Sequence, residues 1–398
     1  MISLLVQAQV TGRQVDVWHG ATSSEVTSVG TPYCDVATAP LQLDAIEVTQ
    51  AIQHLSLAVP LLAGKRTVVR LYLSYYATPG ITVEGQIAVR QAPTDPLVTI
   101  PSLNTVTLDP TQAGSIAPKR DDVTRSLNFL LPTTQTSEGP LIITIGSITN
   151  TATGLPIAVG CEARPTLWFH ATPPLRVRVL GMRYTQGNPP VTYIPRDLDF
   201  DLLDSWLGRA YPVAQVVSSR VLVTATTAPP FSCGDINAQI AAIRALDVAA
   251  GEDPRTHYYG MVSDGGFFMR GCAAGIPSGP APATVASGPT GASTWGWDFD
   301  GSYGDWYGGH ELGHTFGRFH PGFCGESQDD LKNYPYDNGQ LGGSNASFAG
   351  FDVGDPANGV PMAALPGTVW RDVMTYCSNQ WLSAYTYLGV RRRLIAES

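Results

Sequence analysis

An eleven-residue segment constrains the local fold most strongly. Residues His310 to His320 read H-E-L-G-H-T-F-G-R-F-H. On a helix, His310 and His314 are four residues apart and project from one face. Gly317 follows, where a helix can end in a left-handed residue that glycine adopts without strain. The spacing therefore predicts a helix that stops at a glycine, after which the chain turns back and brings His320 to the other two imidazoles.

Three imidazoles around one point indicate a metal site. Zinc at about 2.0–2.1 Å from each nitrogen suits this arrangement, and three protein ligands leave a fourth position open, as in catalytic zinc sites. Glu311 lies about 100° round the helix from His310, so its carboxylate can reach a bound water without being a ligand. Chance placement of the three histidines, the glutamate and the glycine at these offsets has a probability on the order of 10⁻⁵.

The segment resembles the H-E-x-x-H-x-x-G-x-x-H motif of metzincin zinc peptidases, and the D-V-M-T-Y sequence of residues 372–376 resembles the methionine turn of that family. The resemblance covers about Leu175 to the C-terminus. It implies that His310, His314 and His320 bind zinc and that Glu311 is the general base.

Two further roles follow from the resemblance alone. Met374 is expected to form an apolar floor beneath the zinc histidines. Tyr376 occupies the place of a tyrosine that, in the astacin and serralysin branches, contacts the metal or the transition state. The residues after the third histidine, Pro321 and Gly322, resemble those found at that place in serralysins. The cysteines and the long segment between His320 and Met374 do not resemble that branch.

The six cysteines are widely spaced and include no C-x-x-C pair, a pattern typical of disulfides formed in an oxidising compartment. Six cysteines can form three disulfides in fifteen ways, and the spacing alone does not select one of them. If both motifs line one zinc site, Cys324 and Cys377 lie close enough to pair, and the simplest remaining pairs are Cys233 with Cys272 and Cys34 with Cys161. The alternative for Cys34 is a thiolate that blocks the zinc in a latent form. We expect a secreted, extracellular protein whose export signal is removed or not included, because the first ten residues do not resemble one.

The sequence pattern predicts an α+β protein of two domains. Up to about residue 170, short alternating runs such as Thr67–Leu73, Ile81–Val89 and Leu141–Ile148 predict strands and no helix. Residues 1–172 are therefore expected to form an Ig-like β-sandwich. The paired prolines of A-T-P-P-L, residues 171–175, suit a linker. Residues 173–398 are expected to form a metzincin-like catalytic domain, a twisted mixed sheet with an active-site helix.

In this second part, strands and helices alternate. The expected strands are Leu175–Tyr184, Ser219–Thr226, His257–Val262 and Ala283–Ser287. One expected helix carries an apolar stripe at residues 198, 202 and 206, and a second, capped by Asp235, carries isoleucines at 236, 240 and 243. We expect Ala283–Ser287 to be the edge strand that pairs with an extended substrate, and the loop-like segment 325–366 to shape the cleft.

Asp298, Asp300 and Asp305 lie in W-D-F-D-G-S-Y-G-D and could offer oxygens to calcium, although their spacing is not that of an EF-hand loop. The favoured interpretation is a turn that leads into a helix capped by Asp305.

Composition excludes some functions. The formal net charge of −9 argues against a nucleic-acid partner, and no stretch approaches the roughly 20 apolar residues of a membrane span. We expect a monomer that hydrolyses proteins or peptides. The alternatives are an adhesion or glycan-binding protein in which the zinc domain is a scaffold, and a hydrolase of non-peptide amides.

Overall fold

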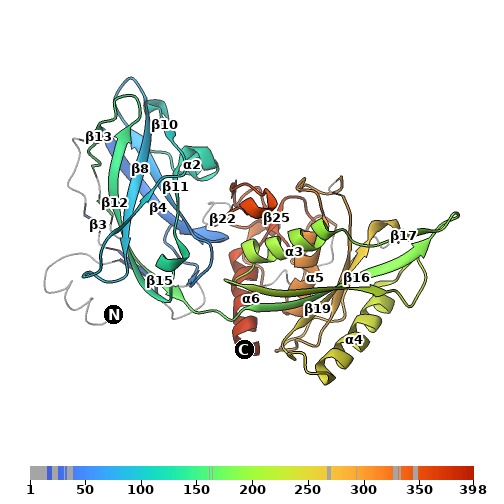
Figure 1. Cartoon of the computed structure of the whole chain (residues 1–398). Helices are drawn as coiled ribbons and strands as arrows, with labels where there is room; N and C mark the ends of the chain where they lie inside the picture. Colours follow the sequence, from blue (N-terminus) through green and yellow to red (C-terminus); the bar gives the residue numbers. More distant parts are fainter. Residues whose placement is uncertain are drawn as a thin grey trace. The chain divides into compact units, whose positions relative to one another are not determined.

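The computed structural model describes residues 16–19, 26–30, 32–33, 39–160, 162–163, 165–266, 270–292, 294–325, 330, 333–343 and 348–398. The chain divides into two compact units, which we describe separately (Figure 1). The first unit comprises residues 1–171, 345–353 and 362–366, and the second comprises residues 172–344, 354–361 and 367–398. None of the helices within the described residues is long and apolar enough to cross a membrane.

The first unit takes two segments from the C-terminal part of the sequence, which the predicted boundary at residue 172 did not anticipate. Strand pairing explains their position. Strand β22 (Phe348–Asp352) pairs antiparallel with β5 (Ile52–His54) and with β23 (Ala363–Leu365). The prediction that residues 325–366 form a loop was therefore wrong for these strands, because a local pattern does not reveal a partner about 300 residues away.

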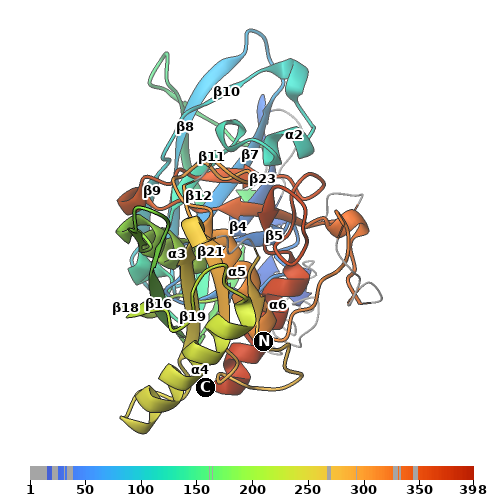
Figure 2. The same cartoon turned by 90° about the vertical axis from the view of Figure 1, so that its right-hand side faces the viewer.

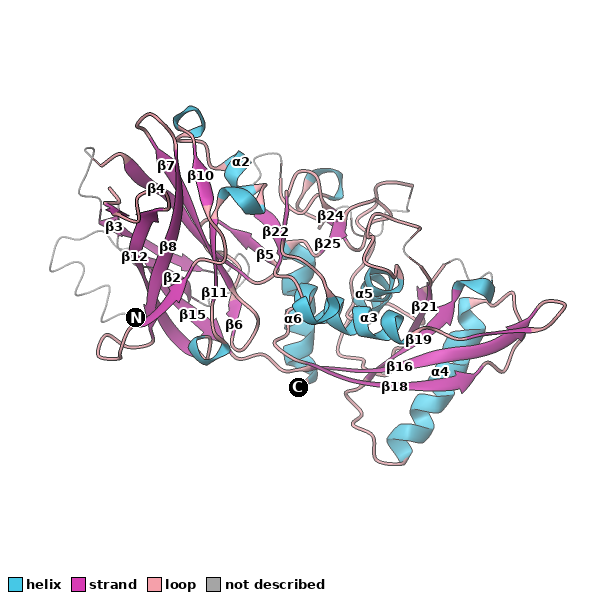
Figure 3. Ribbon diagram, turned by 45° about the horizontal axis from the view of Figure 1, so that its top comes forward, coloured by secondary structure: helices cyan, strands magenta, loops and turns pink. Residues whose placement is uncertain are grey.

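Strands dominate the first unit (Figure 3). One sheet has the order β1 (Asp16–His19), β2 (Val26–Gly30), β15 (Thr166–His170), β12 (Gly139–Asn150), β8 (Ile81–Arg90) and β10 (Val106–Leu108), with β6 (Leu61–Leu62), β9 (Val98–Pro101) and β13 (Pro156–Ile157) at its sides. A second sheet has the order β11 (Leu127–Leu130), β7 (Val68–Tyr75) and β4 (Leu41–Thr49). A short pair joins β3 (Pro32–Tyr33) to β14 (Glu162–Ala163).

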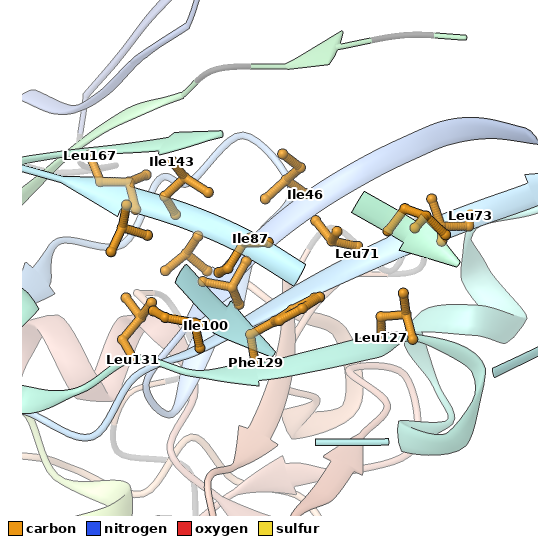
Figure 4. Close-up of a cluster of buried hydrophobic side chains, with 14 of the residues drawn as sticks. Ile46, Leu71, Leu73, Ile87, Ile100, Leu127, Phe129, Leu131, Ile143 and Leu167 are labelled. Carbon is orange, nitrogen blue, oxygen red and sulfur yellow. The ribbon is translucent and has the colours of Figure 1, made fainter. Parts of the chain in front are cut away.

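The two larger sheets share one apolar core. Alternate residues of β8, including Val83, Ile87 and Val89, are buried, as expected for a strand with one face on a core. They pack with apolar residues of the second sheet such as Leu71 and Phe129 (Figure 4). The arrangement is a β-sandwich, and its Ig-like connectivity remains a prediction.

The other face of β4 and β7 carries a buried charge network. Glu47 Oε1 accepts a hydrogen bond from Arg120 Nη2 at 2.6 Å, and Arg70 Nη1 lies 3.6 Å from Glu47 Oε2. Tyr72 donates its hydroxyl proton to the same carboxylate. Burial raises the pKa of Glu47, but the charges of Arg120 and Arg70 outweigh this effect and the net pKa is lowered. The short helix α2 (Ala117–Arg120) supplies one of the two arginines.

The second unit is a mixed sheet with helices on both faces. Strands β18 (Val216–Thr224), β16 (Leu175–Gln186), β19 (His257–Ser263) and β21 (Ala286–Thr290) are parallel in this order, and β20 (Cys272–Ala273) and β17 (Val191–Tyr193) add antiparallel pairs. Helix α4 (Cys233–Ala249) covers one face, and α3 (Asp197–Ala210) and α5 (Gly304–Thr315) lie on the other (Figures 1 and 2). Helix α6 (Ala384–Glu397) ends the chain. The whole protein is thus of the α+β class.

Two local predictions were wrong in this unit. Ser232, and not Asp235, is the N-cap of α4, because its hydroxyl accepts a hydrogen bond from the Asp235 N–H. Residues 283–287 do not form an edge strand. The observed strand β21 lies between β19 and β20 in the sheet, so β20 occupies the edge. Cys272 and Ala273 of β20 pair with Ser287 and Ala286.

Candidate metal centre

Helix α5 is buried along most of its length although it contains several glycines, which are poor helix formers. Close packing explains them. A Cβ atom at Gly309 would lie 2.1 Å from the Trp206 ring, and one at Gly313 would lie 2.5 Å from Met374 Sδ. The helix ends at Thr315, and Gly317 has a φ of +77°, the left-handed conformation that the sequence predicts. The chain therefore reverses before His320.

This reversal brings the three histidines together. His320 Nε2 lies 3.1 Å from His310 Nε2 and 3.0 Å from His314 Nε2. Both helix histidines are buried, and His320 is half-buried. Two nitrogens bound to one tetrahedral zinc at 2.0–2.1 Å are about 3.3 Å apart, so the observed spacing is close to that of a shared ion. This three-histidine group could bind a metal ion.

Backbone carbonyls orient two of the imidazoles. Val373 O lies 2.7 Å from His310 Nδ1, and Arg318 O lies 2.7 Å from His314 Nδ1. A carbonyl can only accept, so each Nδ1 carries the proton and each Nε2 presents a lone pair towards the shared point. Burial, together with the two neighbouring imidazoles, lowers the pKa of His310 well below its usual value. The neutral form that binds metals is therefore favoured.

Glu311 lies on the same helix and is buried. Burial raises the pKa of Glu311 to about 8. This effect outweighs the hydrogen bond from the Ala273 N–H, which lowers the pKa. Among the described residues, Glu311 Oε2 has no hydrogen-bond partner. Gly271 makes room for the carboxylate, since a Cβ there would lie 2.6 Å from Glu311 Oε1. No sequence motif marks Gly271 or Ala273, so sequence reasoning missed both.

Met374 lies against the helix that carries the histidines and is 1% exposed. Asp372, two residues before Met374, shapes this turn. Its Oδ1 accepts a hydrogen bond from the Met374 N–H at 2.8 Å, and its Oδ2 accepts one from the Ser383 N–H at 3.0 Å. The turn also places Val373 O against His310. The sequence analysis includes Asp372 in the D-V-M-T-Y segment but gives it no role, because its two backbone N–H donors are not apparent from the sequence.

Tyr376 lies beside the histidines. Its ring centre is 5.2 Å from that of His320 and 5.7 Å from that of His310, and the side chain is 42% exposed. The guanidinium of Arg270 lies over the same ring, 5.9 Å from its centre. The structure thus brings Tyr376 to the three-histidine group.

A cavity of about 380 Å³ opens beside His310, Glu311 and Tyr376. Aromatic side chains form much of its wall, and Arg270 adds a positive charge. The aromatic residues are Trp295, Trp297, Trp306 and Tyr307. Sequence reasoning missed this wall, although the W-G-W run at residues 295–297 was a usable signal. The cavity is large enough for a side chain of a bound ligand.

Two disulfides lie near the site. Cys324 pairs with Cys377, which ties the segment after His320 to the turn after Met374. Cys233 pairs with Cys272 and joins the start of α4 to β20. Both pairs agree with the sequence prediction. The third predicted pair, Cys34 with Cys161, and the alternative of a Cys34 thiolate lie outside the described residues.

The aspartates of the preceding loop also come together. Each of Asp298, Asp300 and Asp305 offers one carboxylate oxygen, and these oxygens lie within 4.8 Å of one another. Asp305 is not the helix cap that the sequence favoured. Tyr303 is the N-cap of α5 and makes no side-chain cap hydrogen bond, while Asp305 lies inside the first turn.

Comparison with known proteins assigns no family. No known protein family matches the chain, and no curated protein matches it. Metalloproteinase-II from Bacteroides fragilis is 12% identical with a TM-score of 0.27, over 97% of this chain and 94% of that chain. A calcium-binding mutant of β-glucuronidase 2 from Bacteroides uniformis is 10% identical with a TM-score of 0.21, over 56% of this chain. This chain spans 29% of the glucuronidase. Neither likeness is close enough to assign a fold or a function.

Proposed function

We propose that this chain is an extracellular zinc-dependent endopeptidase. The observation that carries the proposal is the convergence of His310, His314 and His320, whose Nε2 atoms lie 3.0–3.1 Å apart in two of the three pairs. Nitrogen ligands favour zinc over calcium or magnesium, which prefer oxygen. The two disulfides are consistent with an extracellular location.

The neighbouring side chains suit hydrolysis of an amide. A bound zinc ion would supply Lewis acidity and lower the pKa of a water molecule to about 7. Glu311 is buried beside the histidines, and in its carboxylate form it would accept a proton from the attacking water and deliver it to the leaving amine. We assign the Tyr376 hydroxyl the role of donating a hydrogen bond to the oxyanion that develops on the carbonyl, because its ring lies beside those of His310 and His320.

The cavity supports a peptide as substrate. Its aromatic wall suits a large side chain, while the half-exposed Tyr376 at its rim leaves the histidines accessible. We expect the bond adjacent to a bulky residue to be cleaved, within chains and not at their ends.

The test combines metal analysis with an activity assay. Elemental analysis should find one zinc per chain, and an unfolded protein should be cut in a chelator-sensitive manner. Glu311→Gln should keep zinc and lower kcat by about 10² to 10⁴, the usual contribution of general acid–base catalysis. Glu138→Gln is the matched control, since Glu138 is exposed in the first unit, and it should leave kcat unchanged.

Three outcomes would contradict the proposal. Stoichiometric zinc without cleavage of a broad panel of proteins would favour the adhesion or glycan-binding alternative. Turnover of small amides without cleavage of proteins would favour a non-peptide amide hydrolase. Full activity in Glu311→Gln would refute the role of the glutamate.

A further inference from the structure

Three aspartates lie immediately before the helix that carries the histidines. Asp298 and Asp300 are half-buried on the loop, and Asp305 is 0% exposed in the first turn of α5. One carboxylate oxygen of each lies within 4.8 Å of the others. The sequence motif of the proposed zinc site does not include any of them.

The hydrogen bonds of Asp300 and Asp305 leave one oxygen of each carboxylate without a donor. Asp305 Oδ1 accepts from the Trp306 N–H at 2.7 Å, and Asp300 Oδ1 accepts from the Ser302 N–H at 3.1 Å. Asp305 Oδ2 and Asp300 Oδ2 are buried and have no hydrogen-bond partner among the described residues. Buried carboxylate oxygens are normally hydrogen-bonded or bound to a metal, because removal from water is costly.

The nearby positive charge does not balance three carboxylates. Arg209 on α3 acts on both Asp300 and Asp305 and lowers their pKa values, but less than burial raises them. The start of α5 adds roughly half a positive charge. Together they amount to roughly +1.5 against three negative charges, so the cluster needs further positive charge or must take up protons.

We propose that Asp298, Asp300 and Asp305 form a binding site for a divalent cation, calcium in particular. All-oxygen ligands are those that calcium prefers, at 2.3–2.6 Å, which allows ligand oxygens to lie up to about 5 Å apart. Magnesium at about 2.0–2.1 Å would require them within about 4.2 Å. The three carboxylate oxygens lie within 4.8 Å of one another, inside the calcium range, and magnesium is usually held by only one or two carboxylates.

The position of the cluster defines what the ion does. Trp297, next to Asp298, and Trp306, next to Asp305, both line the cavity beside the histidines, and their ring centres are 4.2 Å apart. A cation held by the three carboxylates links the loop to the first turn of α5. Its role is therefore to hold the aromatic wall of the cavity against the helix that carries His310.

Binding can be measured without any activity assay. Zinc-loaded protein is titrated with calcium chloride in a calorimeter, and separately with terbium, whose luminescence is sensitised by adjacent tryptophans. We expect one saturable calcium site with a dissociation constant in the micromolar to millimolar range, a calcium-dependent rise in Tm, and an unchanged zinc content.

The variants assign the site. Asp305→Asn and Asp298→Asn should each weaken calcium binding by about tenfold or more and reduce the terbium signal. Asp337→Asn removes the same charge from an exposed position and should bind calcium like the unaltered protein. If Asp305→Asn does not fold, Asp298→Asn and Asp300→Asn, on the half-buried loop, carry the same test.

The proposal is overturned if calcium shows no saturable binding up to millimolar concentrations, or if the aspartate variants bind it as tightly as Asp337→Asn. Magnesium binding without calcium binding would overturn the choice of ion.

Discussion

Removing each disulfide in turn separates global stability from metal binding. The two double variants are Cys324→Ala with Cys377→Ala, and Cys233→Ala with Cys272→Ala. Their sequence separations of 53 and 39 residues are similar. The chain-entropy relation gives about 4 kcal/mol for either cross-link, and the two values differ by only about 0.3 kcal/mol.

Local backbone conformation makes the two disulfides different. Phe323 and Cys324 have φ values of +71° and +59°, a region that non-glycine residues rarely adopt and that costs each of them about 1–2 kcal/mol. The bond to Cys377 holds this strained segment only four residues after His320. Without the bond the segment can relax, which offsets part of the lost stability but allows His320 to move away from the other two histidines.

Two measurements follow. Urea unfolding should show a loss of about 4 kcal/mol for the 233–272 variant and a smaller loss, about 0–2 kcal/mol, for the 324–377 variant. Competition with a chelator should show zinc affinity lowered on the order of tenfold or more in the 324–377 variant alone, as for other groups that orient metal ligands. Equal zinc affinity in the two variants, or a greater loss in the 233–272 variant, would refute this reasoning.

Three further changes test other parts of the molecule. Tyr376→Phe should lower kcat about 100-fold with zinc content unchanged, as for loss of one oxyanion donor; equal kcat in a steady-state assay would exclude that role. Met374→Ala should lower the free energy of unfolding by about 2–5 kcal/mol, and Met374→Leu by less than about 1.5 kcal/mol, because Met374 is buried against the helix; denaturant titration of both variants checks the difference. Glu47→Gln should destabilise the protein by about 3–5 kcal/mol at pH 7. Since the folded-state pKa of Glu47 is lowered, its contribution is present above the unfolded value of about 4.3 and is lost as the pH falls through the folded value. Unfolding measured from pH 7 to pH 2 should therefore show a weaker acid dependence in Glu47→Gln, and an unchanged pH dependence would contradict the assignment.

Much of the second unit follows from local periodicity. Stripes of apolar residues four apart predict α3 and α4, and apolar runs predict β16, β18 and β19 within a few residues. The error at Asp235 has a local cause, since Ser232 three residues earlier is an equally good cap and its hydroxyl reaches the Asp235 N–H. Position in the sheet is not local, and this explains why the interior strand β21 was expected to be an edge.

By itself, the sequence determined the groups that could bind a metal. The spacing of His310 and His314 places two imidazoles on one side of a helix, and Gly317 permits the chain reversal that brings His320 back to them. Both features depend only on backbone geometry within eleven residues. Only the tertiary structure decided the surroundings. Val373 O against His310 and Gly271 beside Glu311 come from segments 63 and 40 residues away, and the aromatic wall around the cavity comes from several elements at once. The same is true of the three aspartates. Their sequence pattern suits a turn as well as a calcium ligand set, and the burial of Asp305, which follows from the packing of α5, makes its carboxylate a candidate cation ligand.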